Sequence, residues 1–220
     1  MIQPWPLTAW NTMARYLHPT RLSLMLLLSA NLPTAHAVDG TITINGEITE
    51  TTCKINGKAP PQNVIVNLPK ISTTALKNKG DTAGATLFTL ELTDCPESLS
   101  GTVKAYFEPG ITTDYSSGDL YAYTYSASID TTSSSTTGTA IPSRSSATKA
   151  SNVEIQLANT DGTAIKVGDD ASKAKGATLV AADSKKKATL RYLARYIKSG
   201  DGTVTTGKLV TYVQYSIVYP

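Results

Sequence analysis

Acidic residues are the first candidates for catalytic chemistry in this chain. The candidates are Glu91, Asp94, Glu97, Asp114 and Asp119. Two carboxylates held a few ångströms apart can cleave a glycosidic bond, one of them as the general acid. Spacing along the sequence does not determine the distance between them in space, and acidic residues in β-turns are usually solvated. We therefore interpret these five as solvated rather than catalytic.

The two histidines, His18 and His36, lie in a segment typical of an export signal. Residues 1–37 are basic, contain no acidic residue, carry a mostly apolar stretch and end in the A-x-A cleavage motif Ala35-His36-Ala37. Cleavage there would leave residues 38–220 without any imidazole. Ser-His and Cys-His nucleophiles and the common zinc sites are then excluded. The sequence predicts neither an enzyme nor a bound cofactor or metal.

Three short acidic turns bear on calcium. They are Asp161-Gly162, Asp169-Asp170 and Asp201-Gly202. No ordered run of oxygen ligands accompanies them, so we interpret them as turn residues.

Two cysteines, Cys53 and Cys95, follow the signal. In an exported protein a single pair is most simply one disulfide. Two buried free thiols are the alternative.

Charge argues against a nucleic-acid partner. The formal net charge is +3, and removing Arg15 and Arg21 with the signal leaves +1. A local basic run, Lys185-Lys186-Lys187, could contact a polyanion such as a sulfated host glycan. The alternative is a solvated run whose charges keep a neighbouring hydrophobic strand from aggregating.

Short alternating apolar runs dominate the rest of the chain. They occur at residues 64–68, 87–92, 103–107 and 152–157, separated by Gly, Pro, Asn and Asp. This pattern predicts one antiparallel all-β domain of sandwich type.

Three segments are less clear. Residues 188–198 fit either a helix or a strand, and their tyrosines favour a strand that forms a hairpin with the terminal strand through Gly200-Asp201-Gly202. Residues 71–79 are expected to be a loop with some helical character. The Ser/Thr-rich stretch 126–151 is interpreted as an exposed loop or edge hairpin, which is compatible with a receptor-contacting loop.

The two ends of the chain look complementary. Residues 38–52 begin with an alternating strand in which Gly40, Ile42, Ile44, Gly46 and Ile48 share one face and polar residues share the other. Residues 211–220 form a second alternating strand, which carries Val213, Tyr215, Ile217 and Tyr219. A free strand at one end and a terminal strand at the other suit a subunit that completes its neighbour's sheet.

Several motifs resemble the subunits of chaperone–usher fimbriae, the type 1-like pilins. They are the alternating strand that runs into Cys53, the order Leu68-Pro69, Gly80-Asp-Thr-Ala-Gly84 and Phe88–Pro96, and the penultimate Tyr219. The runs at 104–110, 113–120 and 215–220 are most similar to the serotype-type fimbrial subunits of the whooping-cough bacterium and its relatives.

This resemblance implies an incomplete immunoglobulin-like sandwich that is completed by donor-strand exchange. The expected layout is a removed signal at 1–37, a donor strand at 38–52 and a pilin domain at 53–220. The expected function is a structural subunit of a surface fimbria, exported through the periplasm and serving cell adhesion. The resemblance implies that residues 213–219 edge the accepting groove and contact a periplasmic chaperone, with an outer-membrane usher and further fimbrial subunits as partners.

Two other functions fit the same residues. A minor adaptor subunit would share the groove and the donor strand. A stand-alone secreted β-sandwich binding module would instead pair its N-terminal strand within its own sheet.

Overall fold

The structure is a computed structural model that describes residues 42–48, 52–124, 148–170 and 173–220. The chain separates into two compact units, Met1–Ile48 and Thr49–Pro220. The predicted signal at 1–37, Gly40 and most of the Ser/Thr-rich stretch lie outside the described residues. Within the described part, no helix has the length and apolar character needed to cross a membrane.

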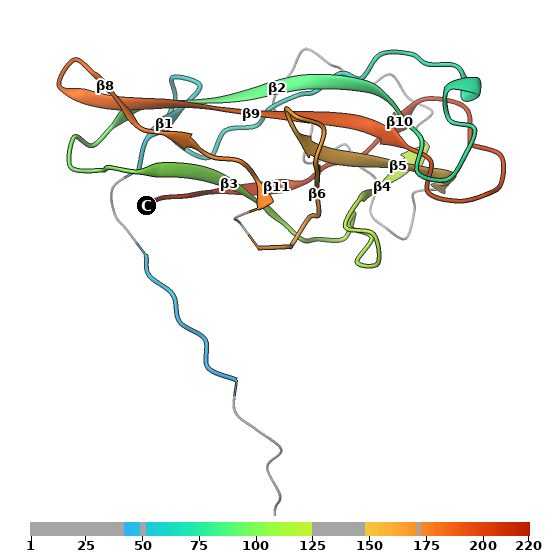
Figure 1. Cartoon of the computed structure of the whole chain (residues 1–220), viewed down its shortest axis with the longest axis horizontal. Coiled ribbons are helices and arrows are strands. Elements are labelled where there is room, and N and C mark those ends of the chain that lie inside the picture. The colour runs from blue at the N-terminus through green and yellow to red at the C-terminus, as the bar shows by residue number, and fades with distance from the viewer. Residues whose placement is uncertain (1–41, 49–51, 125–147, 171–172) are drawn as a thin grey trace, which may run out of the picture. The chain divides into compact units, whose positions relative to one another are not determined.

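The second unit contains a large antiparallel sheet (Figure 1). Its main path follows the order β1-β2-β9-β5-β4-β10, while β6 pairs with β5 and β8 pairs with β9. The bounds are β1 (Lys54–Ile55), β2 (Thr82–Cys95), β4 (Leu120–Thr124), β5 (Thr148–Asn159), β6 (Ala164–Ile165), β8 (Val180–Ala182), β9 (Lys185–Ile197) and β10 (Leu209–Val210).

A smaller sheet has the order β11-β3-β7. Its strands are β3 (Thr102–Glu108), β7 (Ala177–Thr178) and β11 (Gln214–Val218), and each pair is antiparallel. A 3₁₀ turn, η1 (Thr73–Ala75), lies between β1 and β2. In Figure 1, β2 and β9 run along one layer, and β3 and β11 run along the other. The predicted all-β sandwich is confirmed.

Alternating side chains build the core between these layers. Leu90 of β2 lies opposite Leu190 of β9, and both are fully buried. Two residues along, Phe88 lies opposite Tyr192, with ring centroids 5.9 Å apart. Tyr192 also packs edge-on against Phe107 of β3. Its hydroxyl accepts a hydrogen bond from the Ala105 amide at 3.1 Å, so a polar group at the centre is satisfied and joins the two sheets.

The disulfide between Cys53 and Cys95 is present, and both residues are buried. It ties the residue before β1 to the last residue of β2. The pairing predicted for the two cysteines is therefore confirmed.

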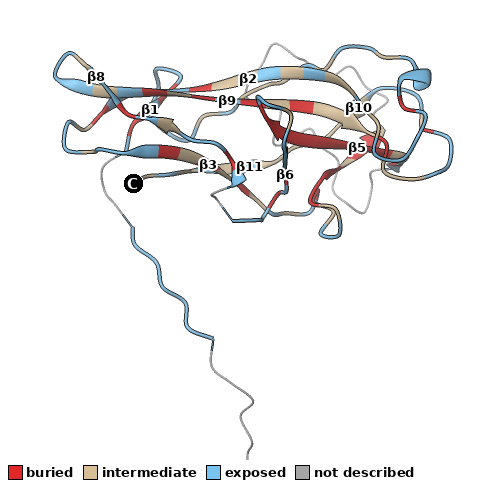
Figure 2. Ribbon diagram, viewed as in Figure 1, coloured by how far each residue is buried: buried red, intermediate tan, exposed pale blue. Residues whose placement is uncertain are grey.

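Strand β5 is buried on both faces near its end, as its red colour in Figure 2 shows. The predicted inward residues Val153, Ile155 and Leu157 are buried, and so are Glu154 and Gln156 between them. The second face is covered by the loop at 110–119, because Gln156 donates a hydrogen bond to the buried Asp119 at 3.1 Å. Sequence alternation alone indicates only the first face.

The predicted hairpin after residue 198 is wrong, although the strand prediction for 188–198 is confirmed by β9. Both edges of β9 are already paired, with β2 and with β5. The terminal strand therefore crosses to the other layer and pairs with β3.

Two further expectations can be compared with the structure. The apolar run 64–68 is assigned to no strand, so the strand expected there is absent. The loop with helical character expected at 71–79 contains η1, whose cap Ser72 accepts a hydrogen bond from the Thr74 amide.

Candidate functional site: an apolar groove

A groove of about 1640 Å³ runs through the second unit. Two segments far apart in sequence line it, residues 60–73 and 204–217, together with Tyr219. Core side chains line it as well, among them Phe88, Leu90 and Leu157. The groove therefore reaches down to the hydrophobic core, where Phe88 is half-buried and Leu90 and Leu157 are buried.

Strand β11 forms one wall. Tyr215 and Ile217 are half-buried, line the groove and pack against the core, while Gln214, Ser216 and Val218 between them are exposed. Val213 and Tyr219, just outside the strand, continue the half-buried row. The structure thus brings together the four residues expected at the groove edge. Within the described part of the chain, no strand lies along the other edge of β11.

Residues 62–72 form the opposite wall. Val64, Val66 and Leu68 are half-buried and pack against the core, while of the residues between them Asn67 is exposed and Ile65 is half-buried. This alternation is that of a strand, yet the segment belongs to no ladder. A β-strand needs a hydrogen-bonded neighbour, and here the neighbouring position is the groove itself.

Tyr215 of β11 and Tyr219, just after its end, form hydrogen bonds with backbone groups near the start of the domain. The Tyr215 hydroxyl donates a hydrogen bond to the Gln62 carbonyl at 2.8 Å, across the groove. The Tyr219 hydroxyl accepts one from the Cys53 amide at 3.0 Å. Burial raises the pKa of Tyr215. Sequence analysis missed Gln62, because a backbone carbonyl leaves no signal in residue types.

The predicted donor residues lie in the first unit. Ile42 and Ile44 are 89% exposed and Ile48 is 99% exposed. A side-chain carbon added at Gly46 would meet no atom within 4 Å. The segment 42–48 therefore presents bare apolar side chains in an extended, unpaired backbone.

The five acidic candidates do not form one site. Glu91, Asp94 and Glu97 are exposed, but Asp119 is buried, so the interpretation of all five as solvated is wrong for Asp119. Burial raises the pKa of Asp119, and a hydrogen bond from Gln156 partly opposes it. The Ser116 hydroxyl, 2.6 Å away, holds the pKa of Asp114 below its usual range.

Sequence analysis missed the third acid of this cluster, Glu154. It is buried on β5 and accepts a hydrogen bond from the Ser117 hydroxyl at 3.3 Å. Burial, followed by the charges of Asp114 and Asp119, raises the pKa of Glu154. None of the three acids lines the groove. Within the described residues, no group of His, Cys, Asp and Glu is arranged to hold a metal.

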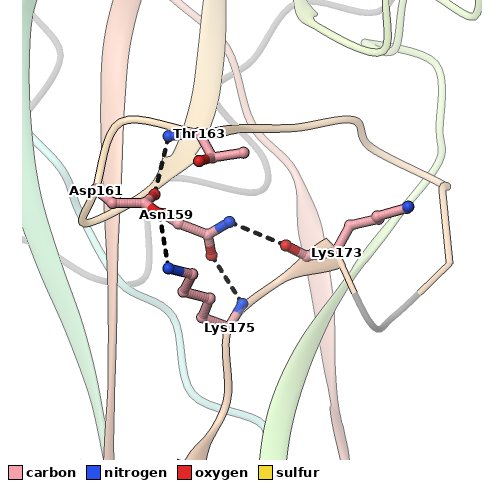
Figure 3. A network of polar contacts seen from close by, with 5 residues as sticks. All are labelled: Asn159, Asp161, Thr163, Lys173 and Lys175. Carbon is pink, nitrogen blue, oxygen red and sulfur yellow. Dashed lines mark hydrogen bonds and ion pairs between the residues drawn. The ribbon is translucent and has the colours of Figure 1, made fainter.

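Asp161 has a structural role that Figure 3 shows. It accepts a hydrogen bond from the Thr163 amide at 3.0 Å and pairs with the Lys175 ammonium at 2.6 Å. The hydrogen bond from Lys175 lowers the pKa of Asp161 to about 2. Next to it, the Asn159 amide side chain bridges the Lys173 carbonyl and the Lys175 amide. The turn interpretation of Asp161 is confirmed.

The three consecutive lysines are not brought together on one face. They open β9, where successive side chains point to opposite faces. Lys185 and Lys187 are exposed, whereas Lys186 donates a hydrogen bond to the Leu99 carbonyl. A polyanion contact stays a prediction, and it now concerns Lys185 and Lys187.

Comparison with known proteins agrees with this geometry. The sequence profile of the type-1 fimbrial protein family matches residues 68–220. The chain is 42% identical over 207 residues to the serotype 2 fimbrial subunit of Bordetella pertussis, which covers 91% of this chain and 96% of that protein. It is 44% identical over 190 residues to the fimbrial protein FimX of the same organism, with 84% and 91% covered.

A chain from the structure of a chaperone–usher pilus shares the fold, with a TM-score of 0.50 and 20% identity over 86% of this chain and 100% of that chain. The two open sheets and the groove are those of an incomplete immunoglobulin-like pilin sandwich. The protein belongs to the type-1 fimbrial protein family and is a structural subunit of a surface fimbria, reached by export through the periplasm. The resemblance to the serotype-type subunits is confirmed.

Proposed function

We propose that this chain is the repeating shaft subunit of a fimbria and that it polymerises by donor-strand exchange. Residues 38–52 of one copy would fill the groove of the next. The observation that supports this most is the groove itself, which lies between two walls, β11 and residues 62–72, whose backbones lack a strand partner on the groove side.

The donor segment suits such a groove in side chains as well as in backbone. Ile42, Ile44 and Ile48 share one face and are exposed in the first unit. Burying an isoleucine side chain contributes about 1.5–3 kcal/mol. An extended donor can also pair with both walls, so main-chain hydrogen bonds supply affinity and alternate side chains supply register. Removal of the donor requires all of these contacts to break together, which makes the fibre kinetically stable.

An empty groove is a hazard before assembly, because an exposed strand edge and an open core promote aggregation. We therefore propose that a periplasmic chaperone covers β11 and the groove until an outer-membrane usher exchanges it for the next subunit. The described relatives are fimbrial subunits, and we assign this chain no catalytic role. Repetition along a fibre would also turn a weak contact between Lys185, Lys187 and a sulfated glycan into useful avidity.

Substitution in the donor segment tests this function. Ile44→Asp places a charge in an apolar groove, and an unpaired buried charge costs several kcal/mol. We expect incorporation into fibres to fall by at least about 100-fold, measured by quantifying subunits in sheared fimbriae. Secretion to the periplasm should be unchanged.

Thr43→Asp is the matched control, since Thr43 lies on the opposite face of the same strand. It adds the same charge one residue away and should leave incorporation nearly normal. Normal fibres from the Ile44→Asp variant would contradict the donor assignment.

A further inference from the structure

The hydrogen bond between Tyr215 and Gln62 lies where a donor strand would have to pass. Both residues line the groove, and they come from opposite walls. The bond is 2.8 Å long and joins a side-chain hydroxyl to a backbone carbonyl. Tyr215 and Gln62 are both half-buried.

Each partner is held by its own element. Tyr215 lies opposite Phe107 in the ladder between β11 and β3. Gln62 follows Pro60 and Pro61, whose rings restrict the backbone. The Gln62 side chain also donates hydrogen bonds to the carbonyls of Ala59 and Pro61. The bond therefore connects two anchored walls rather than two loose loops.

A donor strand and this bond compete for the same space and the same acceptor. The bond joins two segments that both line the groove, so a strand that enters between them has to cross the line from the Tyr215 hydroxyl to the Gln62 carbonyl. The Gln62 carbonyl also belongs to the wall with which the donor would pair. An inserted strand thus displaces the hydroxyl from the carbonyl.

We propose that the Tyr215 hydroxyl and the Gln62 carbonyl form a clasp that holds the empty groove partly shut, and that donor insertion must open it. The proposal rests on donor-strand exchange as the function of the groove. Tyr215 is then a positioning residue that sets the rate of exchange, in addition to lining the groove.

Tyr215→Phe removes the hydroxyl and keeps the ring. The full chain is expressed with its own leader, purified from the periplasm and mixed with an excess of a fluorescent peptide of residues 38–52. Fluorescence anisotropy then gives the second-order rate of uptake. We expect the variant to take up the peptide about fivefold faster, the factor that corresponds to one ordinary hydrogen bond.

A second readout separates a clasp from a merely structural contact. A clasp stabilises only the empty form, so Tyr215→Phe should lower the melting temperature of the empty chain and leave that of the peptide-filled chain unchanged. Tyr192→Phe is the comparator, because it also removes a hydrogen bond from a tyrosine hydroxyl to a backbone carbonyl, that of Lys175, and neither Tyr192 nor Lys175 lines the groove. It should slightly destabilise both forms and leave the uptake rate unchanged.

The outcomes distinguish a failure of the clasp proposal from a failure of donor-strand exchange. Uptake by the wild type with an equal or slower rate for Tyr215→Phe would overturn the clasp and leave donor-strand exchange standing. Equal destabilisation of the empty and filled forms by Tyr215→Phe would also overturn it. Failure of the wild type to take up the peptide at all would contradict the proposed function and the clasp with it.

Discussion

Glu154 is a buried carboxyl whose nearest charges include other acids. Burial, then Asp114 and Asp119, raise its pKa, while Ser117 and Lys149 partly oppose the rise. The folded chain therefore binds this proton more tightly than the unfolded chain does. The resulting contribution to stability is fully present below the unfolded pKa and is lost as the pH rises through the folded pKa.

Glu154→Gln should remove this loss and keep an acceptor for the Ser117 hydroxyl. We expect the melting temperature at pH 7 to rise by ~2–4 °C, the shift that about 1 kcal/mol produces in a domain of this size. Melting curves between pH 4 and 8 should show a flatter dependence than in the wild type. Glu91→Gln, at an exposed position on β2, is the control. An unchanged pH dependence in Glu154→Gln would contradict this assignment.

The roles of individual residues could be predicted only in part from the sequence. The disulfide followed from the cysteine count, since two cysteines in an exported chain leave one pairing. The buried acids did not, because Glu154 looks like an outward strand residue until the 110–119 loop covers it. The lysine run at 185–187 was also misleading, because three adjacent charges suggest one patch. In a strand successive side chains point to opposite faces, so Lys186 lies on the other face and binds the Leu99 carbonyl.

At the scale of elements, the apolar segment 64–68 has the alternation of a strand and lacks a strand partner. We expect donor insertion to supply that partner. Backbone amides facing the groove would then become hydrogen-bonded, and their hydrogen exchange should slow by at least about tenfold when the peptide of residues 38–52 is added. Exchange measured by mass spectrometry with short proteolytic fragments would resolve the segment.

Core amides of β5 serve as the internal control in that experiment, because β5 is already paired with β4 and β9. They should change little. Equally fast exchange in segment 64–68 with and without the peptide would show that the segment is an ordinary loop beside the groove.

Individual strands were predictable because hydrophobic alternation is local, as β2, β3, β5 and β9 show. Which strands pair with one another was harder to predict. The Gly200–Gly202 turn suggested a hairpin, but pairing depends on which edges are free, and β9 has none. The strand expected at 64–68 failed for a related reason, since its partner is not part of the same domain in our account.

At the scale of the whole molecule, this sandwich is incomplete by itself. The complementary ends of the sequence suggested it, and the groove between β11 and residues 62–72 gives it a location. The resemblance implied one edge of the groove, residues 213–219, but the sequence did not indicate the opposite wall, residues 62–72, because that wall is defined by the strand missing beside it. A shaft subunit and a minor adaptor share this property, whereas a stand-alone binding module does not.

Thermal melting of residues 38–220, with and without a peptide of residues 38–52, tests the claim most directly. The account predicts a marginally stable chain that melts at a low temperature alone, and a rise in melting temperature of about 5–10 °C with the peptide at 100 times its dissociation constant. A peptide carrying Ile44→Asp should give no such rise. If the chain melts cooperatively as a monomer and its melting temperature does not change with the peptide, its sandwich is complete without a donor strand, and the donor-strand account is wrong.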